Sequence, residues 1–201
     1  MPDRLAPDDP GIARAAELLR DGKLVAFPTD TVYGIGCRAG DADALARLFA
    51  AKRRPLEKAV PWLVASFDEV ARLGFAADEP VTRLAERFWP GALTIVVQAS
   101  DGASTQAFRV PDHPVALALL AAAGPLAVSS ANRSGEPETL DADDVSIAFA
   151  DSDEPAATLD GGRVPGGVAS SVVDLTTARG RLVREGALPR SEIERVIGPI
   201  D

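Results

Sequence analysis

The heptapeptide Ala92-Leu93-Thr94-Ile95-Val96-Val97-Gln98 is apolar and rich in β-branched residues, a composition typical of a buried strand. On both sides of it, short apolar runs alternate with stretches in which apolar residues recur at helical spacing. This alternation predicts an α/β protein with a mixed sheet and helices packed on it. We expect strands at residues 23–27, 60–65, 92–98, 107–110, 126–129, 157–159, 171–175 and 182–184, and helices at residues 41–52, 66–73, 79–88, 115–123 and 141–149 and from residue 191 onward.

Turn-forming residues separate these elements. Asp9 is expected to be the N-cap of the first helix, which begins at Pro10 and is closed by Gly22. Residues 34–39 (GIGCRA) match a loose dinucleotide-binding pattern, but no helix starts at the second glycine, so we interpret them as a structural turn. The glycine-rich residues 161–167 are interpreted as a mobile loop, too short to separate domains. We therefore expect residues 1–201 to form a single domain.

The composition is that of an ordinary globular protein, with 46% hydrophobic and 25% charged residues and a formal net charge of -9. The acidic balance argues against broad attraction to nucleic acid, which needs many cations. No apolar run is long enough to span a membrane and no secretory signal is seen at the N-terminus, so we expect a cytoplasmic protein. A single cysteine, Cys37, and a single histidine, His113, argue against a disulfide framework and a multi-histidine metal site.

A cluster of cations stands out in this acidic chain. Residues 51–58 (AKRRPLEK) hold four cations at the end of a predicted helix, where Pro55 stops the helix. Positive charge at a helix C-terminus complements the helix dipole, which is one explanation. The other is an anion site, because guanidinium and ammonium groups pair with phosphate. Position alone does not decide between them.

Polar residues also follow or precede several predicted strands. Residues 129–135 (SSANRSG) place two hydroxyls and an amide at the carboxyl end of a strand, where open α/β sheets bind ligands, although the same residues also build ordinary turns. Ser170 and Ser171 begin another strand. Arg109 and Arg184 each end an apolar strand, where an arginine points either at an anionic ligand or at an internal carboxylate.

Taken together, these motifs resemble those of the YrdC family of threonylcarbamoyl-AMP synthases, over about residues 10–190. The motifs that carry the resemblance are PTDTVYG at residues 28–34, KRRPLEK at 52–58, WPGALT at 89–94, RVP at 109–111, SAN at 130–132, SS at 170–171 and REGA at 184–187. Each is weak alone, and their order and spacing make the combination specific. The resemblance implies a twisted α/β sheet with a concave ligand-binding face.

The resemblance also implies an enzyme, a nucleotidyltransferase that joins L-threonine, bicarbonate and ATP into threonylcarbamoyl-AMP and releases pyrophosphate. A partner transferase then moves the threonylcarbamoyl group to an adenosine of certain tRNAs, and a weak contact with tRNA itself is among the expected partners. By resemblance, L-threonine is bound by Thr31, Arg109, Ser130 and Ser170. The nucleotide is bound by Lys52, Arg54, Lys58, Asn132 and Arg184, with Thr105 in a loosely aligned loop. Lys52 and Arg54 are the expected catalytic residues.

Some positions depart from the family pattern. Ser171 stands where threonine is usual, Lys58 where many relatives carry asparagine, and Leu63 where some longer members have a histidine that contacts threonine. The chain ends soon after Arg184, so it resembles the short, single-domain form. We expect Mg²⁺ to arrive with ATP, bridging phosphates and water, and no metal site built by the protein itself.

Two other functions fit some of these residues. A non-catalytic RNA-binding module of the same fold would use the cations of residues 52–58 together with Arg133, although the acidic balance and the few aromatics weigh against it. A related enzyme that makes a carbamoyl adenylate from carbamoyl phosphate is the third candidate. Such domains usually sit in larger chains that have zinc-finger-like cysteines.

Overall fold

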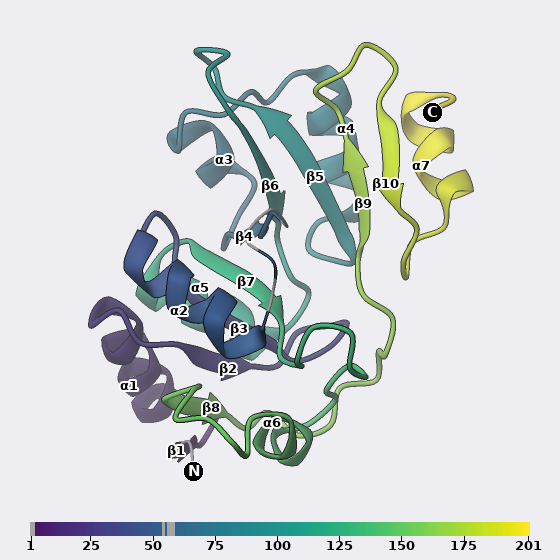
Figure 1. The fold of residues 1–201 in the computed structure, drawn as a ribbon. Coiled ribbons are helices and arrows are strands. Elements are labelled where there is room, and N and C mark those ends of the chain that lie inside the picture. The colour runs from purple at the N-terminus through teal and green to yellow at the C-terminus, as the bar shows by residue number, and fades with distance from the viewer. Residues whose placement is uncertain (1–2, 54, 56–58) are drawn as a thin grey trace.

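The computed structural model describes residues 3–53, 55 and 59–201 (Figure 1). The described strands are β1 (Asp3–Leu5), β2 (Val25–Phe27), β3 (Gly34–Arg38), β4 (Trp62–Leu63), β5 (Leu93–Gln98), β6 (Thr105–Arg109), β7 (Leu126–Ser130), β8 (Ala157–Leu159), β9 (Ser171–Asp174) and β10 (Arg181–Arg184). The described helices are α1 (Asp9–Arg20), α2 (Ala42–Lys52), α3 (Asp68–Arg72), α4 (Glu79–Phe88), α5 (Pro114–Ala123), α6 (Ala142–Ala148) and α7 (Arg190–Ile197). None of these helices is both long and apolar enough to cross a membrane.

The strands form one sheet in the order β1-β8-β2-β3-β7-β4-β6-β5-β9-β10. Pairs such as β5 with β9 and β4 with β6 are parallel, whereas β3 with β7 and β5 with β6 are antiparallel. The predicted mixed α/β sheet is therefore confirmed. The short strand β4 joins two halves of the sheet, a first half of β1, β8, β2, β3 and β7 and a second half of β6, β5, β9 and β10. It pairs with β7 on one side and with β6 on the other.

The interpretation of residues 34–39 as a turn is wrong. Gly34–Arg38 forms β3, which lies in the middle of one half of the sheet and pairs with both β2 and β7. Glycine is unfavourable in strands, but a Cβ on Gly34 would come within 2.7 Å of the Val128 side chain on β7. The close approach of β7 therefore requires glycine at this position, although glycine makes a strand harder to recognise from the sequence.

Alternating side chains in the first half of the sheet supply two separate hydrophobic layers. Leu24 and Ala26 pack with α2 and α6 on one face, whereas Val25 and Phe27 pack with α1 and α5 on the other. Figure 1 shows these helices on both sides of β2, β3 and β7. The first helix is capped by Asp8 and not by Asp9, since the Asp8 carboxylate accepts the Gly11 N–H and Asp9 lies in the first turn.

The second half of the sheet is covered by helices on one face. Leu93, Ile95 and Val97 of β5 are buried in a core that also contains α4 and α7 side chains (Figure 1). The intervening residues of β5, Thr94 and Val96, lie on the other face and line a cavity. The heptapeptide at residues 92–98 therefore separates the core from a hollow face of the sheet.

Candidate functional site

A cavity of about 630 Å³ lies against the hollow face of β5, β6 and β9 and extends to β7 and the segment before β3. A volume of this size is typical of small-molecule sites. Among the predicted site residues, those that line it are Thr31, Arg109, Ser130, Ser170 and Arg184. Residues separated by more than 150 positions in the sequence are thus brought to one cavity by the sheet. Leu63, at the position where some relatives have histidine, also lines it.

Arg109, at the end of β6, is held from three directions. Its Nε donates to the carbonyl of Gly91 at 2.9 Å, one terminal nitrogen donates to Thr31 Oγ1 at 3.0 Å, and the other pairs with Asp30 Oδ1 at 2.5 Å. The side chain is only 7% exposed and that of Asp30 is 16% exposed. The guanidinium therefore presents a fixed fork at the wall of the cavity before any ligand arrives.

The electrostatics of this pair are those of a buried charge that has a partner. Burial lowers the pKa of Arg109 from its ordinary value, and the neighbouring Asp30 carboxylate opposes that effect. Asp30 also accepts the backbone N–H of Asp112 at 3.0 Å. Each side chain of the pair thus has a hydrogen-bonded partner in a place where an unpaired charge would be unfavourable.

Ser170 and Arg184 form the opposite wall, at β9 and β10. The hydroxyls of Ser170 and Thr94 are 2.8 Å apart, and Arg184 donates from Nε and Nη2 to the carbonyl of Ser170 at 3.1 and 2.7 Å. Arg184 is exposed, in contrast to Arg109. Ser171 has a different task, because its hydroxyl accepts the N–H groups of Gly186 and Leu188 and so ties the REGA segment to β9.

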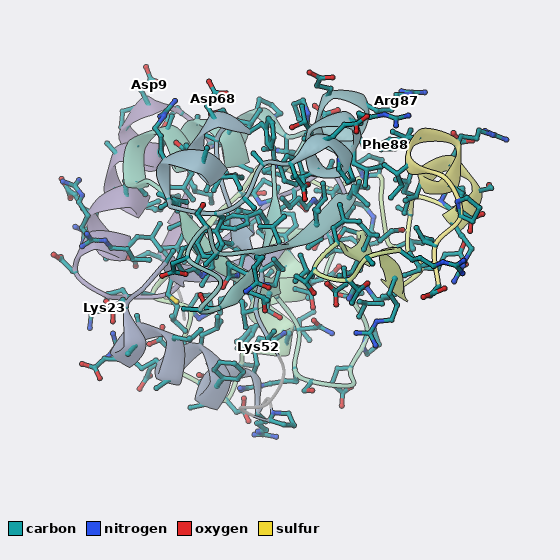
Figure 2. The ribbon with its side chains drawn as sticks, turned by 90° about the horizontal axis from the view of Figure 1, so that it is seen from above. Asp9, Lys23, Lys52, Asp68, Arg87 and Phe88 are labelled. Atoms are coloured by element: carbon teal, nitrogen blue, oxygen red, sulfur yellow. The ribbon has the colours of Figure 1, made fainter. Side chains whose placement is uncertain are left out.

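Lys52 and Asn132 lie behind Ser130. The hydroxyl of Ser130 donates to Asn132 Oδ1 at 2.6 Å, and Lys52 Nζ donates to the carbonyl oxygens of Ser130 and Asn132. Lys52 is 1% exposed, and in Figure 2 it lies nearer the middle of the view, while Asp9, Lys23 and Asp68 lie at the rim. Neither Lys52 nor Asn132 is among the residues that line the cavity, so the contacts described here hold the SAN segment in place.

The other cations considered from the sequence, Arg53 and Arg133, make contacts within the protein. Arg53 is the C-cap of α2 and pairs with Asp151 at 2.6 Å, which fits the helix-end explanation. Arg133, considered for RNA binding, donates to the carbonyl of Ala51, pairs with Asp151 and lies 4.8 Å over the ring of Phe149. Arg54 and Lys58, predicted to bind the nucleotide, lie outside the described residues.

Thr105 lines a second cavity of about 420 Å³ and not the first. The two cavities share Ala59, Val96 and Ala107 as lining residues, so they adjoin. The predicted role of Thr105 in nucleotide binding therefore applies to this neighbouring hollow and stays a prediction.

Backbone packing fixes the segments that carry the site residues. Gly167 N–H donates to the carbonyl of Thr31 at 2.8 Å, and a Cβ on Gly166 would lie 1.8 Å from that carbonyl oxygen. Tyr33 Oη accepts the N–H of Gly161 and donates to the carbonyl of Gly162. The glycine-rich residues 161–167, interpreted from sequence as a mobile loop, are thus packed on the PTDTVYG segment. On the other wall, a Cβ on Gly186 would lie 2.2 Å from the carbonyl oxygen of Ala169.

Sequence reasoning missed several polar residues of the site, among them Thr29, Thr94 and Glu138 in the cavity lining and Asp30, the partner of Arg109. Asp30 and Thr94 lie inside quoted motifs. Nothing in the sequence indicated that Asp30 pairs with Arg109 or that Thr94 bonds to Ser170. Glu138 lines the cavity from the loop after β7. Cys37 and His113, the single residues of their types, do not line the cavity. Burial raises the pKa of Cys37 to about 12, and burial lowers the pKa of His113.

A mixed sheet whose hollow face carries two arginines and several hydroxyls is typical of proteins that bind a small anionic ligand. The model of the Sua5/YciO/YrdC family, described as telomere recombination, matches residues 17–186. The chain is 40% identical to the threonylcarbamoyl-AMP synthase of Bacillus subtilis over 98% of its own length and 60% of that protein. It is 40% identical to the putative threonylcarbamoyl-AMP synthase of Mycobacterium tuberculosis, over 94% of this chain and 89% of the relative.

The solved structures agree with the sequence comparison. Pyrococcus abyssi Sua5 complexed with L-threonine superposes with a TM-score of 0.89 at 39% identity, over 100% of this chain and 62% of that one. The chain belongs to the Sua5/YciO/YrdC family. It spans about 60% of the length of the Bacillus and Pyrococcus proteins that it matches.

Proposed function

We propose that this protein is a threonylcarbamoyl-AMP synthase, which forms threonylcarbamoyl-AMP and pyrophosphate from L-threonine, bicarbonate and ATP. The observation that supports this most is the convergence of Thr31, Arg109, Ser130, Ser170 and Arg184 on one cavity. The family relatives named as threonylcarbamoyl-AMP synthases and the threonine-bound structure of a relative point to the same reaction.

The Arg109 wall suits an amino acid. In the proposal the fixed guanidinium binds the threonine carboxylate, and the hydroxyls of Thr31, Ser130 and Ser170 surround the side-chain hydroxyl and the amine. A site built to hydrogen-bond a substrate hydroxyl rejects the analogue that lacks it, because its own polar groups are then left unpaired. Valine, which has a methyl in place of the hydroxyl, should therefore be a very poor substrate.

The Arg184 wall suits phosphate. Nitrogen of threonine joins the carbon of bicarbonate with loss of water, and an oxygen of the resulting carbamate attacks the α-phosphorus of ATP. The bond from that phosphorus to the pyrophosphate oxygen breaks, and negative charge accumulates on the departing group. Positioned cations and donors stabilise that charge more than a tuned base would. In the proposal Arg184 and the cations Arg54 and Lys58 serve the nucleotide, with Arg54 acting on the reacting phosphate. Lys52 and Asn132 serve it through the SAN segment that they hold behind the cavity.

Magnesium enters the proposal as the companion of ATP. The described residues include no group of three or more His, Cys, Asp or Glu side chains that would form a protein cage. Magnesium usually keeps several waters and binds through substrate phosphates with one or two carboxylates at most. The ion would supply further neutralisation of the triphosphate.

The product implies a downstream partner. Threonylcarbamoyl-AMP is a mixed anhydride of a carbamic and a phosphoric acid, so an acceptor nucleophile is needed to use it. In the proposal a tRNA-modifying transferase accepts it for an adenosine of tRNA, and direct contact of this protein with tRNA is weak.

Pyrophosphate release tests the proposed function. We expect release from ATP and Mg²⁺ only when L-threonine and bicarbonate are both present, together with an adenylate of the mass of threonylcarbamoyl-AMP. Release from carbamoyl phosphate in place of bicarbonate and threonine would favour a carbamoyl-adenylate enzyme. Salt-sensitive RNA affinity without any pyrophosphate would favour an RNA-binding module.

A further inference from the structure

Glu138 has a carboxylate oxygen that is buried in the wall of the cavity and has no hydrogen-bond partner among residues 3–53, 55 and 59–201. Within the described residues, no ion pair includes Glu138, although Arg109 and Arg184 line the same cavity. Arg109 is occupied by Asp30 and Thr31, and Arg184 by the carbonyl of Ser170. A buried acceptor of this kind is unfavourable by itself and calls for an explanation.

The backbone around Glu138 is fixed. The neighbouring Thr139 is 3% exposed, its hydroxyl donates to the carbonyl of Ala131 at 3.2 Å, and its carbonyl accepts the N–H of Tyr33 at 2.9 Å. The loop therefore lies beside the segment that carries Thr31, the residue that accepts from Arg109. The Glu138 carboxylate is presented at the amino-acid side of the cavity.

We propose that the Glu138 carboxylate binds the α-ammonium group of the amino-acid substrate. The inference rests on the proposed function and adds a residue to it. A free amino acid is a zwitterion, so its site needs one cation and one anion. Arg109 supplies the cation, and Glu138 supplies a carboxylate oxygen that accepts no hydrogen bond from the part of the chain that the structure describes. A ligand ammonium would give that oxygen the partner it lacks and offset the unfavourable burial.

Titration calorimetry with Glu138→Gln tests this inference. The substitution keeps the shape and removes the charge, and we expect L-threonine affinity to fall by roughly 10- to 100-fold, the range of a charge-assisted hydrogen bond. Affinity for a non-hydrolysable ATP analogue with Mg²⁺ should stay the same. The matched control is Glu136→Gln, an exposed glutamate in the same loop, which should bind threonine as the unaltered protein does.

A second ligand separates the ammonium contact from a general disturbance of the site. 3-Hydroxybutanoate is threonine without its amino group. The unaltered protein should prefer threonine over it, and Glu138→Gln should lose most of that preference while binding 3-hydroxybutanoate about as well as before. Equal losses for both ligands, a loss confined to the ATP analogue, or no loss at all would each overturn the inference. If the unaltered protein binds no threonine, the proposed function itself fails.

Discussion

The two arginines of the cavity are prepared for ligands in different ways. Arg109 is buried, paired with Asp30 and held at all three nitrogens, whereas Arg184 is exposed on the edge strand β10 and donates to the carbonyl and the hydroxyl of Ser170. A buried and fixed guanidinium holds its donors in one orientation, so it loses little conformational freedom when a ligand binds. Its removal leaves a buried carboxylate unpaired and destabilises the fold. An exposed guanidinium contributes mainly charge. Selectivity for the amino acid is therefore expected at the first wall and phosphate attraction at the second.

Removing Arg109 should have the largest effect. Arg109→Ala leaves the Asp30 carboxylate buried without its cation, so we expect the free energy of unfolding to fall by about 3–5 kcal/mol. Denaturant unfolding measures this, and calorimetry should show loss of threonine binding. Asp30→Asn in the same background should recover part of the stability, because a neutral amide replaces the unpaired charge. A stability loss below about 1 kcal/mol would mean that the pair holds little of the fold.

Adding a methyl group on either wall gives a matched pair of variants. Gly166→Ala drives a Cβ into the Thr31 carbonyl, and Gly186→Ala drives one into the Ala169 carbonyl. Overpacking of this kind typically destabilises by roughly 1–3 kcal/mol. We expect the first to weaken threonine binding more and the second to weaken nucleotide binding more, as measured by calorimetry.

Gly162→Ala is the control for this pair. Gly162 lies in the same loop with φ of 78°, and a Cβ added to it would meet nothing within 4 Å. Alanine there is strained by roughly 1–2 kcal/mol but touches neither wall. It should lower stability without changing the ratio of threonine to nucleotide affinity. A changed ratio would show that the loop acts through its conformation and not through the Thr31 contact.

Arg184→Ala should change stability by less than about 0.5 kcal/mol, because the side chain is exposed. Pyrophosphate release should fall by roughly 10- to 100-fold if the guanidinium stabilises developing phosphate charge. Arg181→Ala, at the other end of β10 and paired with Asp174, is the control and should leave release unchanged. Equal rates for the two variants would remove Arg184 from the nucleotide site.

Cys37 should show the smallest effect. Burial raises the pKa of its thiol from 9.0 to about 12, so the unfolded chain releases that proton first as pH rises. The associated stability is complete below about pH 9 and is lost as pH rises toward 12. Iodoacetamide at pH 8 should leave the folded protein unmodified. Cys37→Ala should retain pyrophosphate release, and loss of that release would make Cys37 a candidate nucleophile.

Sequence patterns predicted the fold where one physical signal dominated. The β-branched run at residues 92–98 identified β5, and the helical spacing around Leu48 identified α2. Strand β3 was missed because Gly34 and Gly36 are required by the approach of β7, a contact that the sequence does not record. The site followed the same rule. Glu138 lies in no quoted motif, and Asp30, although inside one, owes its role to Arg109, a residue far away in the sequence.

The two-residue strand β4 has a consequence for how ligands act on stability. It is the seam between the two halves of the sheet, and the cavity draws Thr31 and Ser130 from one half and Arg109 and Ser170 from the other. A ligand that contacts both walls therefore links the two halves, and its binding free energy stabilises their association. Amide hydrogen exchange at Trp62 and Leu63 should slow on saturation with both substrates, more than exchange in α1 does.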